Sequence, residues 1–299
     1  MTILEFTKIY PSEFACKIDF KLRREKEGVV CKKCQCTTHY WLQSKWQWQC
    51  SKCKFRTTLR SGTVMHSAKL SFYKWYACMA FMSFSKKGIS ALEMQRQLEH
   101  KRYGTIWKLM HKLRDGMGLR DDKYQLHDFI EFDEGYLEHA TSEKVKLKRG
   151  RGSQRKVNVA VMAESTPLED LETGKKSSQC RYFKMKSLKT HEKTEVNQVV
   201  AEYINENAVI FSDKSTSYTD FSEFVETHLS SKSTKELTKT TLKWVHIAIS
   251  NAKRNLLGVY HMIKMKYLQS YLNEFCYKLN RRYFGKRLFD RLVIATIKN

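Results

Sequence analysis

The stretch DFIEFDEGY, residues Asp128–Tyr136, decides how the rest of the chain is interpreted. Apolar and acidic residues alternate from Phe129 to Asp133, and a period of two is typical of a half-buried β-strand. The strand is expected to end at Asp133 and Glu134, and Gly135 allows the chain to turn there. A carboxylate fixed at the end of a core strand is well placed to hold a metal ion. The alternative interpretation is a surface strand with ordinary solvated acids.

A large excess of positive charge surrounds this stretch. Among 299 residues there are 55 Lys and Arg against 31 Asp and Glu, which gives a net charge of +24 at pH 7. Each basic side chain set against a phosphate releases condensed counterions, so this balance favours a nucleic-acid partner over a membrane surface. A basic protein without such a partner is the alternative. The length and the 41% hydrophobic content predict two or three domains with a sizeable core.

The chain shows no signal for a membrane. No segment approaches the roughly 18 consecutive apolar residues that a membrane helix needs. The N-terminal run MTILEFTKIYPSEF lacks the basic-then-apolar layout of a signal peptide. The cysteines outside the motif described next are scattered like reduced core thiols. We therefore expect a cytoplasmic protein that joins the nucleoid when it is bound to DNA.

Residues 29–60 contain two C-x-x-C pairs, separated by fifteen residues (35 through 49). The pairs are formed by Cys31, Cys34, Cys50 and Cys53. This spacing is typical of a zinc ribbon, in which four thiolates close a tetrahedral structural Zn²⁺ site. Cys36 and His39 are alternative ligands with poorer spacing, and two accidental pairs are the other alternative.

Residues before and after the cysteine motif have helical periodicity. In residues 1–28, Phe14, Ile18 and Leu22 recur every four residues and predict a helical lead-in. Residues 66–120 are expected to be helical throughout, with Ser90 as N-cap and Glu93 three residues later. A helix, a short turn and a basic helix predict a helix-turn-helix DNA-binding domain. A plain three-helix bundle would have similar periodicity.

From residue 125 the pattern changes to strands alternating with helices. This order predicts an α/β domain with a mixed sheet over residues 125–299. Segments 164–178 and 229–240 are expected to be loops. The expected elements are strands at 130–133, 157–163, 180–185, 208–212 and 242–245, helices at 196–203 and 221–228, and further helices from Ser250 onward.

A basic segment, KVKLKRGRGSQRK, separates the first two of these strands. It is either a solvated loop or an arm that follows a phosphate backbone beside the active site, and the second interpretation is favoured because the segment begins close to Asp133. Its basic residues are Lys144, Lys146, Lys148, Arg149, Arg151, Arg155 and Lys156.

Asp133 and Asp213 are each expected to end a central strand, so their carboxylates can share one divalent cation. Hard oxygen ligands favour Mg²⁺ or Mn²⁺. Asn251, separated from Asp213 by 37 residues (214 through 250), is expected on the first turn of a helix and can supply a third oxygen. Lys253 and Arg254 follow it and can meet a scissile phosphate. For Asn251, an ordinary helix N-terminal residue is the alternative.

Five quoted stretches resemble the DDE-type transposases of bacterial insertion sequences, specifically the ISXO-like group. PSEFACKIDFKLRREKEGVVCKKC resembles the lead into the zinc ribbon of that group, and RSGTVMHSAKLSFYKWYACMAFMSFSKKGISALEMQRQL resembles its linker and helix-turn-helix. IEFDEGY and FSDKSTSY are similar to its two catalytic strands, and HIAISNAKRNLLGVYHMIKMKYLQSYLNEFCYKLNRRYF to its C-terminal signature.

The resemblance implies an RNase H-like (retroviral-integrase-like) core that nicks and joins DNA ends with Mg²⁺. It implies that Asp133 and Asp213 are metal-binding catalytic residues, and that the protein binds double-stranded DNA, both element ends and target, as a homodimer or higher oligomer. The third position, often Glu in the superfamily, aligns with Asn251. A subgroup uses Asn with a nearby Lys, which implies a role for Lys253. The run GVYH stands where the family has a GTHH-like run, so the resemblance extends to His261.

The rival hypothesis is a catalytically inactive DNA-binding regulator or a domesticated transposase. The zinc ribbon, the helix-turn-helix and the charge fit it equally well. Cleavage of an element end that depends on a divalent metal distinguishes the two.

Overall fold

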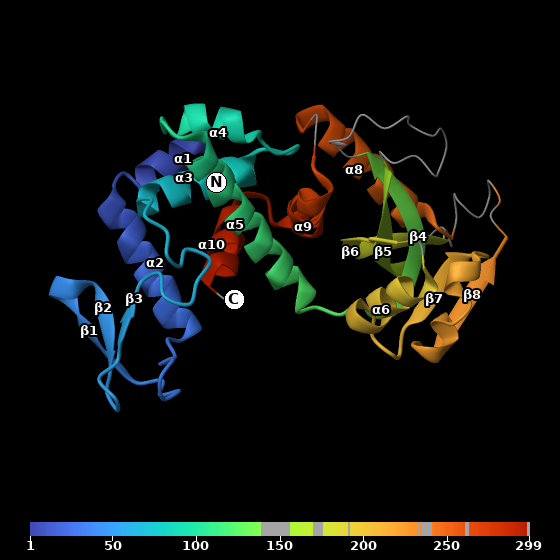
Figure 1. The fold of residues 1–299 in the computed structure, drawn as a ribbon, viewed down its shortest axis with the longest axis horizontal. Coiled ribbons are helices and arrows are strands. Elements are labelled where there is room, and N and C mark those ends of the chain that lie inside the picture. The colour runs from blue at the N-terminus through green and yellow to red at the C-terminus, as the bar shows by residue number, and fades with distance from the viewer. Residues whose placement is uncertain are drawn as a thin grey trace. The chain divides into compact units, whose positions relative to one another are not determined.

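Two compact units make up the computed structural model of the chain: Met1–Arg120 with Arg281–Asn299, and Asp121–Asn280 (Figure 1). The structure describes residues 1–138, 156–169, 176–190, 192–232, 234, 241–260 and 263–297. The sequence analysis expected residues 281–299 in the catalytic domain, whereas the structure groups them with the N-terminal residues. The two units are described separately below.

The first unit begins with two helices rather than one lead-in helix. Thr2 accepts a hydrogen bond from the Glu5 N–H in a capping box and starts α1 (Ile3–Ile9). Ser12 accepts from the Ala15 N–H and starts α2 (Glu13–Glu27). Because Ser12 follows Pro11 and caps a new helix, the predicted helix is divided at this point.

A small antiparallel sheet and a set of helices complete the unit. The sheet has the order β1-β2-β3, and Ser90 caps α4 by accepting from the Glu93 N–H at 3.1 Å, as the sequence predicts. The helix-turn-helix arrangement itself stays a prediction. The remaining elements are β1 (His39–Leu42), β2 (Gln47–Cys50), β3 (Arg56–Thr58), α3 (Phe72–Phe84), α4 (Ala91–Gln97), α5 (Tyr103–Asp122) and α10 (Leu288–Ile297).

The C-terminal helix α10 belongs to this unit because of contacts that are distant in sequence. The Phe289 ring lies 5.6 Å from the Tyr10 ring and 5.8 Å from the Tyr76 ring. Asp290 accepts a hydrogen bond from Arg23 of α2 at 2.6 Å. Buried aromatic contacts of this kind dominate packing energies, so they account for the grouping.

The second unit is built on a five-stranded sheet with the order β6-β5-β4-β7-β8. β4 pairs antiparallel with β5 and parallel with β7, while β5–β6 is antiparallel and β7–β8 is parallel. A three-strand meander followed by a crossover helix to parallel strands is the RNase H-like topology, so the predicted mixed α/β fold is confirmed. The elements are β4 (Phe129–Glu138), β5 (Lys156–Glu169), β6 (Lys176–Ser187), α6 (Lys193–Tyr203), β7 (Val209–Asp213), β8 (Thr227–Ser231), α8 (Lys243–Val259) and α9 (Met265–Asn280).

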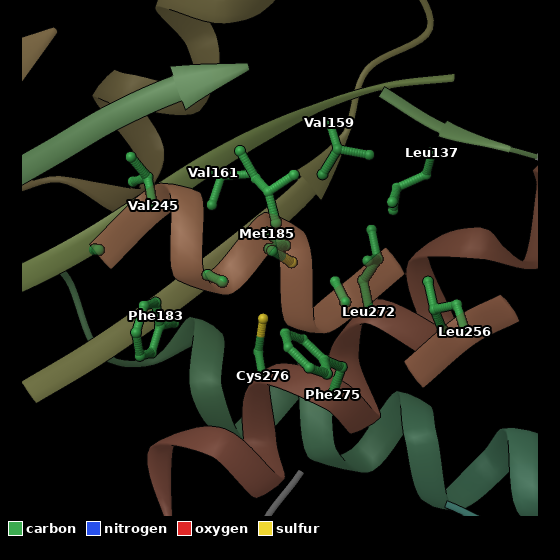
Figure 2. Close-up of a cluster of buried hydrophobic side chains, with 14 of the residues drawn as sticks. Leu137, Val159, Val161, Phe183, Met185, Val245, Leu256, Leu272, Phe275 and Cys276 are labelled. Atoms are coloured by element: carbon green, nitrogen blue, oxygen red, sulfur yellow. The ribbon is translucent and has the colours of Figure 1, made fainter. Parts of the chain in front are cut away.

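Both faces of the sheet are covered. One face packs against α8 and α9: Figure 2 shows Val159 and Val161 of β5 facing Val245 and Leu256 of α8 across this core. The other face packs against α6 and the short helices that follow β7, where the Phe132 ring contacts the rings of Tyr218 and Phe221. Successive β4 residues alternate between the two faces, as the period of two predicts.

Several predicted boundaries are wrong, and each has a physical reason. β4 continues to Glu138 instead of turning at Gly135. An added Cβ at Gly135 would lie 3.1 Å from the Ile249 side chain, so the glycine allows close approach of α8 and makes no turn. The strand predicted at 242–245 is the start of α8, and Asn251 therefore lies in the middle of this 17-residue helix.

The remaining differences concern the segments around β5, β6 and β8. The helix predicted at 221–228 is a short 3₁₀ turn, Phe221–Glu223, followed by β8. β5 reaches Glu169 and β6 begins at Lys176, so the loop predicted at 164–178 is largely strand. β8 also takes the first residues of the loop predicted at 229–240.

Candidate active site and metal centres

Asp133 of β4 and Asp213 of β7 lie side by side. The parallel register pairs Phe129 with Val209 and Glu131 with Phe211, and Asp133 and Asp213 each follow this last pair by two residues. Residues in register on parallel strands point to the same face, here the face that α8 covers. Repulsion between the two carboxylates also helps to raise the pKa of Asp133. The structure therefore brings together the two acids that the sequence analysis selected.

Asp133 is held by its own strand and approached by α8. Its Oδ1 accepts a hydrogen bond from the Glu134 N–H at 2.7 Å. Its Oδ2 lies 3.7 Å from Nε2 of His246, and 18% of the Asp133 side chain is exposed. Burial raises the pKa of Asp133 to about 6, and the charges of Asp213 and Glu134 also raise this pKa. The Glu134 N–H and His246 act in the opposite direction and lower it. Holding this carboxylate ionised without a cation is therefore costly.

His246 lies beside Asp133, and the sequence analysis did not select it. It lies on α8, whose buried stripe of Val245, Ala248, Ile249, Ala252 and Leu256 faces the sheet. Successive helix residues are rotated by about 100°, so Lys253, seven residues later, lies within about 20° of His246 around the axis. The stretch HIAISNAK contained the signal for this pair, because its His and Lys are seven residues apart and so share one side of a helix. It was missed because the helix was expected to start at Ser250.

Asn251 lies on a different side of α8. Five residues after His246, it is rotated by about 140° from it. Its Oδ1 accepts a hydrogen bond from the Arg254 guanidinium at 2.7 Å. The structure thus places His246 and Lys253 on the flank of α8 that faces Asp133, and Asn251 and Arg254 elsewhere on the helix surface.

Glu134 points to the opposite face of the sheet from Asp133. It accepts hydrogen bonds from the Asn158 amide and from the Tyr218 hydroxyl, both on buried side chains. Burial raises the pKa of Tyr218, and the nearby carboxylates raise it further, so this hydroxyl stays a donor. These bonds fix the strand from behind the Asp133 carboxylate.

The four cysteines form a second candidate metal centre. Sγ of Cys34 lies 3.3 Å from Sγ of Cys53 and 3.5 Å from Sγ of Cys50, and Sγ of Cys31 lies 3.5 Å from Sγ of Cys53. All four ligand atoms lie within 4.8 Å of one another; among the described residues, no other set of three or more His, Cys, Asp or Glu does so. Two hairpin knuckles place them, as the Cys31 and Cys50 N–H groups donate to carbonyls five residues later. The geometry suits tetrahedral Zn²⁺.

Most of the predicted phosphate-contacting residues fall outside the described part of the chain. Lys144, Lys146, Lys148, Arg149, Arg151 and Arg155 lie there, and so does His261. Lys156 begins β5, opposite Glu138 in the antiparallel register. Lys253 and Arg254 are exposed on α8. Within the described residues, no helix has the length and apolar character to cross a membrane.

Comparisons with known proteins give one family and several distant structural likenesses. A family model described as ISXO2-like transposase domain matches residues 125–280, which is 156 of the 299 residues. The Mos1 strand transfer complex shares 11% identity at a TM-score of 0.31, covering 75% of this chain and 78% of that chain. The mariner Mos1 paired end complex with Mg shares 10% identity at a TM-score of 0.26, covering 73% and 78%. No curated protein matches.

Proposed function

The chain belongs to the family of ISXO2-like transposase domains, and from this membership we propose that it binds the terminal inverted repeats of an insertion sequence and catalyses metal-dependent strand cleavage and transfer. The observation that carries the proposal is the pair Asp133 and Asp213 on neighbouring parallel strands, with His246 against Asp133. The net charge of +24 suits double-stranded DNA, both element ends and target, as the partner. We expect a homodimer or higher oligomer on DNA, acting on the bacterial nucleoid in the cytoplasm.

The chemistry of Asp133 and Asp213 fits a divalent cation, although with His246 they do not bring three ligand atoms as close together as the four cysteines do. Asp133 and Asp213 offer two partly desolvated carboxylates that repel each other, and a dication between them removes this repulsion. In our proposal His246 is the third ligand, because it is the α8 side chain that reaches Asp133. When bound, Mg²⁺ or Mn²⁺ activates the attacking hydroxyl and stabilises the leaving oxygen of an in-line displacement. Lys253, on the same flank of α8, contacts the scissile phosphate.

A nicking assay on a labelled element end tests the proposed function. We expect cleavage with Mg²⁺ or Mn²⁺ and none when the divalent metal is withheld. The rival function, a DNA-binding regulator without chemistry, is favoured by one observation: the third group at the site is an imidazole where a carboxylate would supply a further charge. Specific binding of the element end without nicking in either metal would establish that rival.

The cysteine cluster is proposed to hold one structural Zn²⁺ through Cys31, Cys34, Cys50 and Cys53. The backbone N–H groups of Cys53 and Lys52 lower the pKa of Cys50, which favours the thiolate that zinc needs. Trp48 is 2% exposed, and its indole N–H donates to Glu25 of α2, so it reports on the packing of the sheet that the metal is expected to stabilise.

Cys50→Ser is therefore expected to lower the zinc content from about one ion per chain to near zero, and to expose Trp48 to solvent. Atomic absorption and tryptophan fluorescence measure the two effects. Cys36→Ser is the matched control, because Cys36 lies outside the cluster and its thiol contacts the Thr38 carbonyl and Ser51. Full zinc content in Cys50→Ser, or equal loss in Cys36→Ser, would contradict the assignment.

A further inference from the structure

A buried carboxylate of β4 contacts the beginning of α8. Glu131 is 4% exposed and lies two residues before Asp133 on the same face of the strand. Its Oε2 accepts hydrogen bonds from the Trp244 N–H at 2.6 Å and from the Val245 N–H at 3.1 Å. Both donors are distant from Glu131 in sequence, since they lie 113 and 114 positions after it.

This contact replaces a missing helix cap. The first N–H groups of a helix have no partner within the helix, and a side-chain oxygen usually satisfies them. Leu242 occupies the N-cap position of α8 and has no side-chain oxygen to offer. Glu131 satisfies two of these donors from the neighbouring strand. The strand therefore determines where α8 begins and how it is rotated.

The same strand also supplies the metal-binding acid. His246 directly follows the two N–H groups that Glu131 accepts, and its Nε2 lies 3.7 Å from Asp133 Oδ2. One step further along the same face, Gly135 lets Ile249 pack against the strand. Three successive positions of one face of β4 thus meet three successive parts of α8.

We propose that Glu131 is a positioning residue: its hydrogen bonds to the α8 N-terminus hold His246 against Asp133 and so complete the divalent-metal site. This inference rests on the proposed function, because it takes Asp133 and His246 as metal ligands. Glu131 acts through the helix and does not itself contact the metal or the DNA.

A matched control lies on the next strand. Glu164 of β5 is fully buried, and it accepts hydrogen bonds from the Tyr124 hydroxyl and the His127 N–H. It is therefore comparable in burial and in accepting a backbone N–H, but it also lies 3.6 Å from the Arg181 guanidinium, and none of these partners belongs to α8. Loss of its carboxylate measures the general cost of removing a buried acceptor from this sheet.

The test compares Glu131→Met with Glu164→Met in zinc-loaded protein without DNA. Met fills a similar volume and accepts no strong hydrogen bond. Mn²⁺ binding is titrated by electron paramagnetic resonance, and amide hydrogen exchange is followed at Trp244 and Val245. We expect Glu131→Met to raise the Mn²⁺ dissociation constant about 10- to 100-fold and to speed exchange at both amides. Glu164→Met should stay within about twofold of wild type on both measurements.

Conservative variants complete the design. Glu131→Gln keeps an oxygen that can accept from both N–H groups, so it should bind Mn²⁺ within about threefold of wild type. If Glu131→Met fails to fold, Glu131→Asp is compared with Glu164→Asp, because each substitution shortens the side chain by one methylene and moves the carboxylate away from its hydrogen-bond donors.

The outcomes separate this inference from the proposed function. Faster exchange at Trp244 and Val245 in Glu131→Met with unchanged Mn²⁺ affinity would mean that Glu131 only caps the helix. This result would overturn the inference and leave the proposed function intact. Equal weakening in both Met variants would also overturn it. Wild-type protein that binds no Mn²⁺ would overturn the proposed function, and this inference with it.

Discussion

Asp133→Asn is expected to abolish metal-dependent nicking of an element end and, at the same time, to stabilise the folded protein. Asparagine keeps the shape of the side chain but removes the negative charge that binds the cation. Metal ions contribute several kcal/mol of transition-state stabilisation, so the rate should fall on the order of 10³-fold. Binding of the element end should be retained, since Asp133 makes no proposed DNA contact. Asp213→Asn should show the same loss of nicking.

The gain in stability follows from the pKa of Asp133. Burial raises this pKa from 3.8 to about 6, so above pH 6 the folded state bears the cost of ionising a carboxylate that the unfolded chain ionises freely. The cost is largest above the folded pKa and disappears as the pH falls from 6 towards 4. In buffer without divalent metal, Asp133→Asn should therefore raise the free energy of unfolding by about 1–3 kcal/mol at pH 7.5.

Urea unfolding at pH 7.5 and at pH 4.5 measures this effect, with the smaller gain expected at pH 4.5. A variant that is inactive and less stable at pH 7.5 would indicate damage to the fold instead of loss of a ligand. A variant that still nicks DNA at the wild-type rate would remove Asp133 from the site.

His246→Ala is expected to lower nicking at least about 100-fold, whereas Asn251→Ala should stay within about threefold of wild type. The two residues lie on the same helix, so the pair is internally controlled for helix stability. His246 reaches Asp133, while the Asn251 amide oxygen is engaged by Arg254. Initial nicking rates at saturating Mn²⁺ and equal DNA occupancy measure the difference.

The reverse result has an equally clear meaning. If Asn251→Ala lost activity and His246→Ala kept it, the third ligand would be the residue selected from the sequence, and α8 would have to rotate when metal binds. Lys253→Ala provides a further check, since its position on the His246 flank predicts a loss of rate with little change in Mn²⁺ affinity.

The strands that carry the two acids could be predicted because their signals are local. Alternation identified β4, and a short buried run ending in an acid identified β7. The spacing of the four cysteines predicted a metal site, and the structure brings their sulfur atoms together. In each case a few neighbouring residues contained the information that the structure uses.

The start of α8 could not be predicted in this way. Leu242–Val245 is an apolar run too short to distinguish a strand from a helix by periodicity. The group that starts the helix is Glu131, 113 residues earlier, and no local pattern reveals it. Because the start was misplaced, His246 was passed over and Asn251 was assigned to a first turn. The grouping of α10 with the N-terminal helices was missed for a similar reason, since the ring contact of Phe289 with Tyr10 and the hydrogen bond of Asp290 with Arg23 join residues that are distant in sequence.

Anomalous diffraction from crystals soaked in Mn²⁺ tests most directly whether the two strands and α8 form one metal site. We expect a peak about 2 Å from a carboxylate oxygen of both Asp133 and Asp213, with the His246 imidazole within bonding reach. A peak coordinated by Asn251 and remote from Asp133, or no peak near either carboxylate at saturating Mn²⁺, would contradict it.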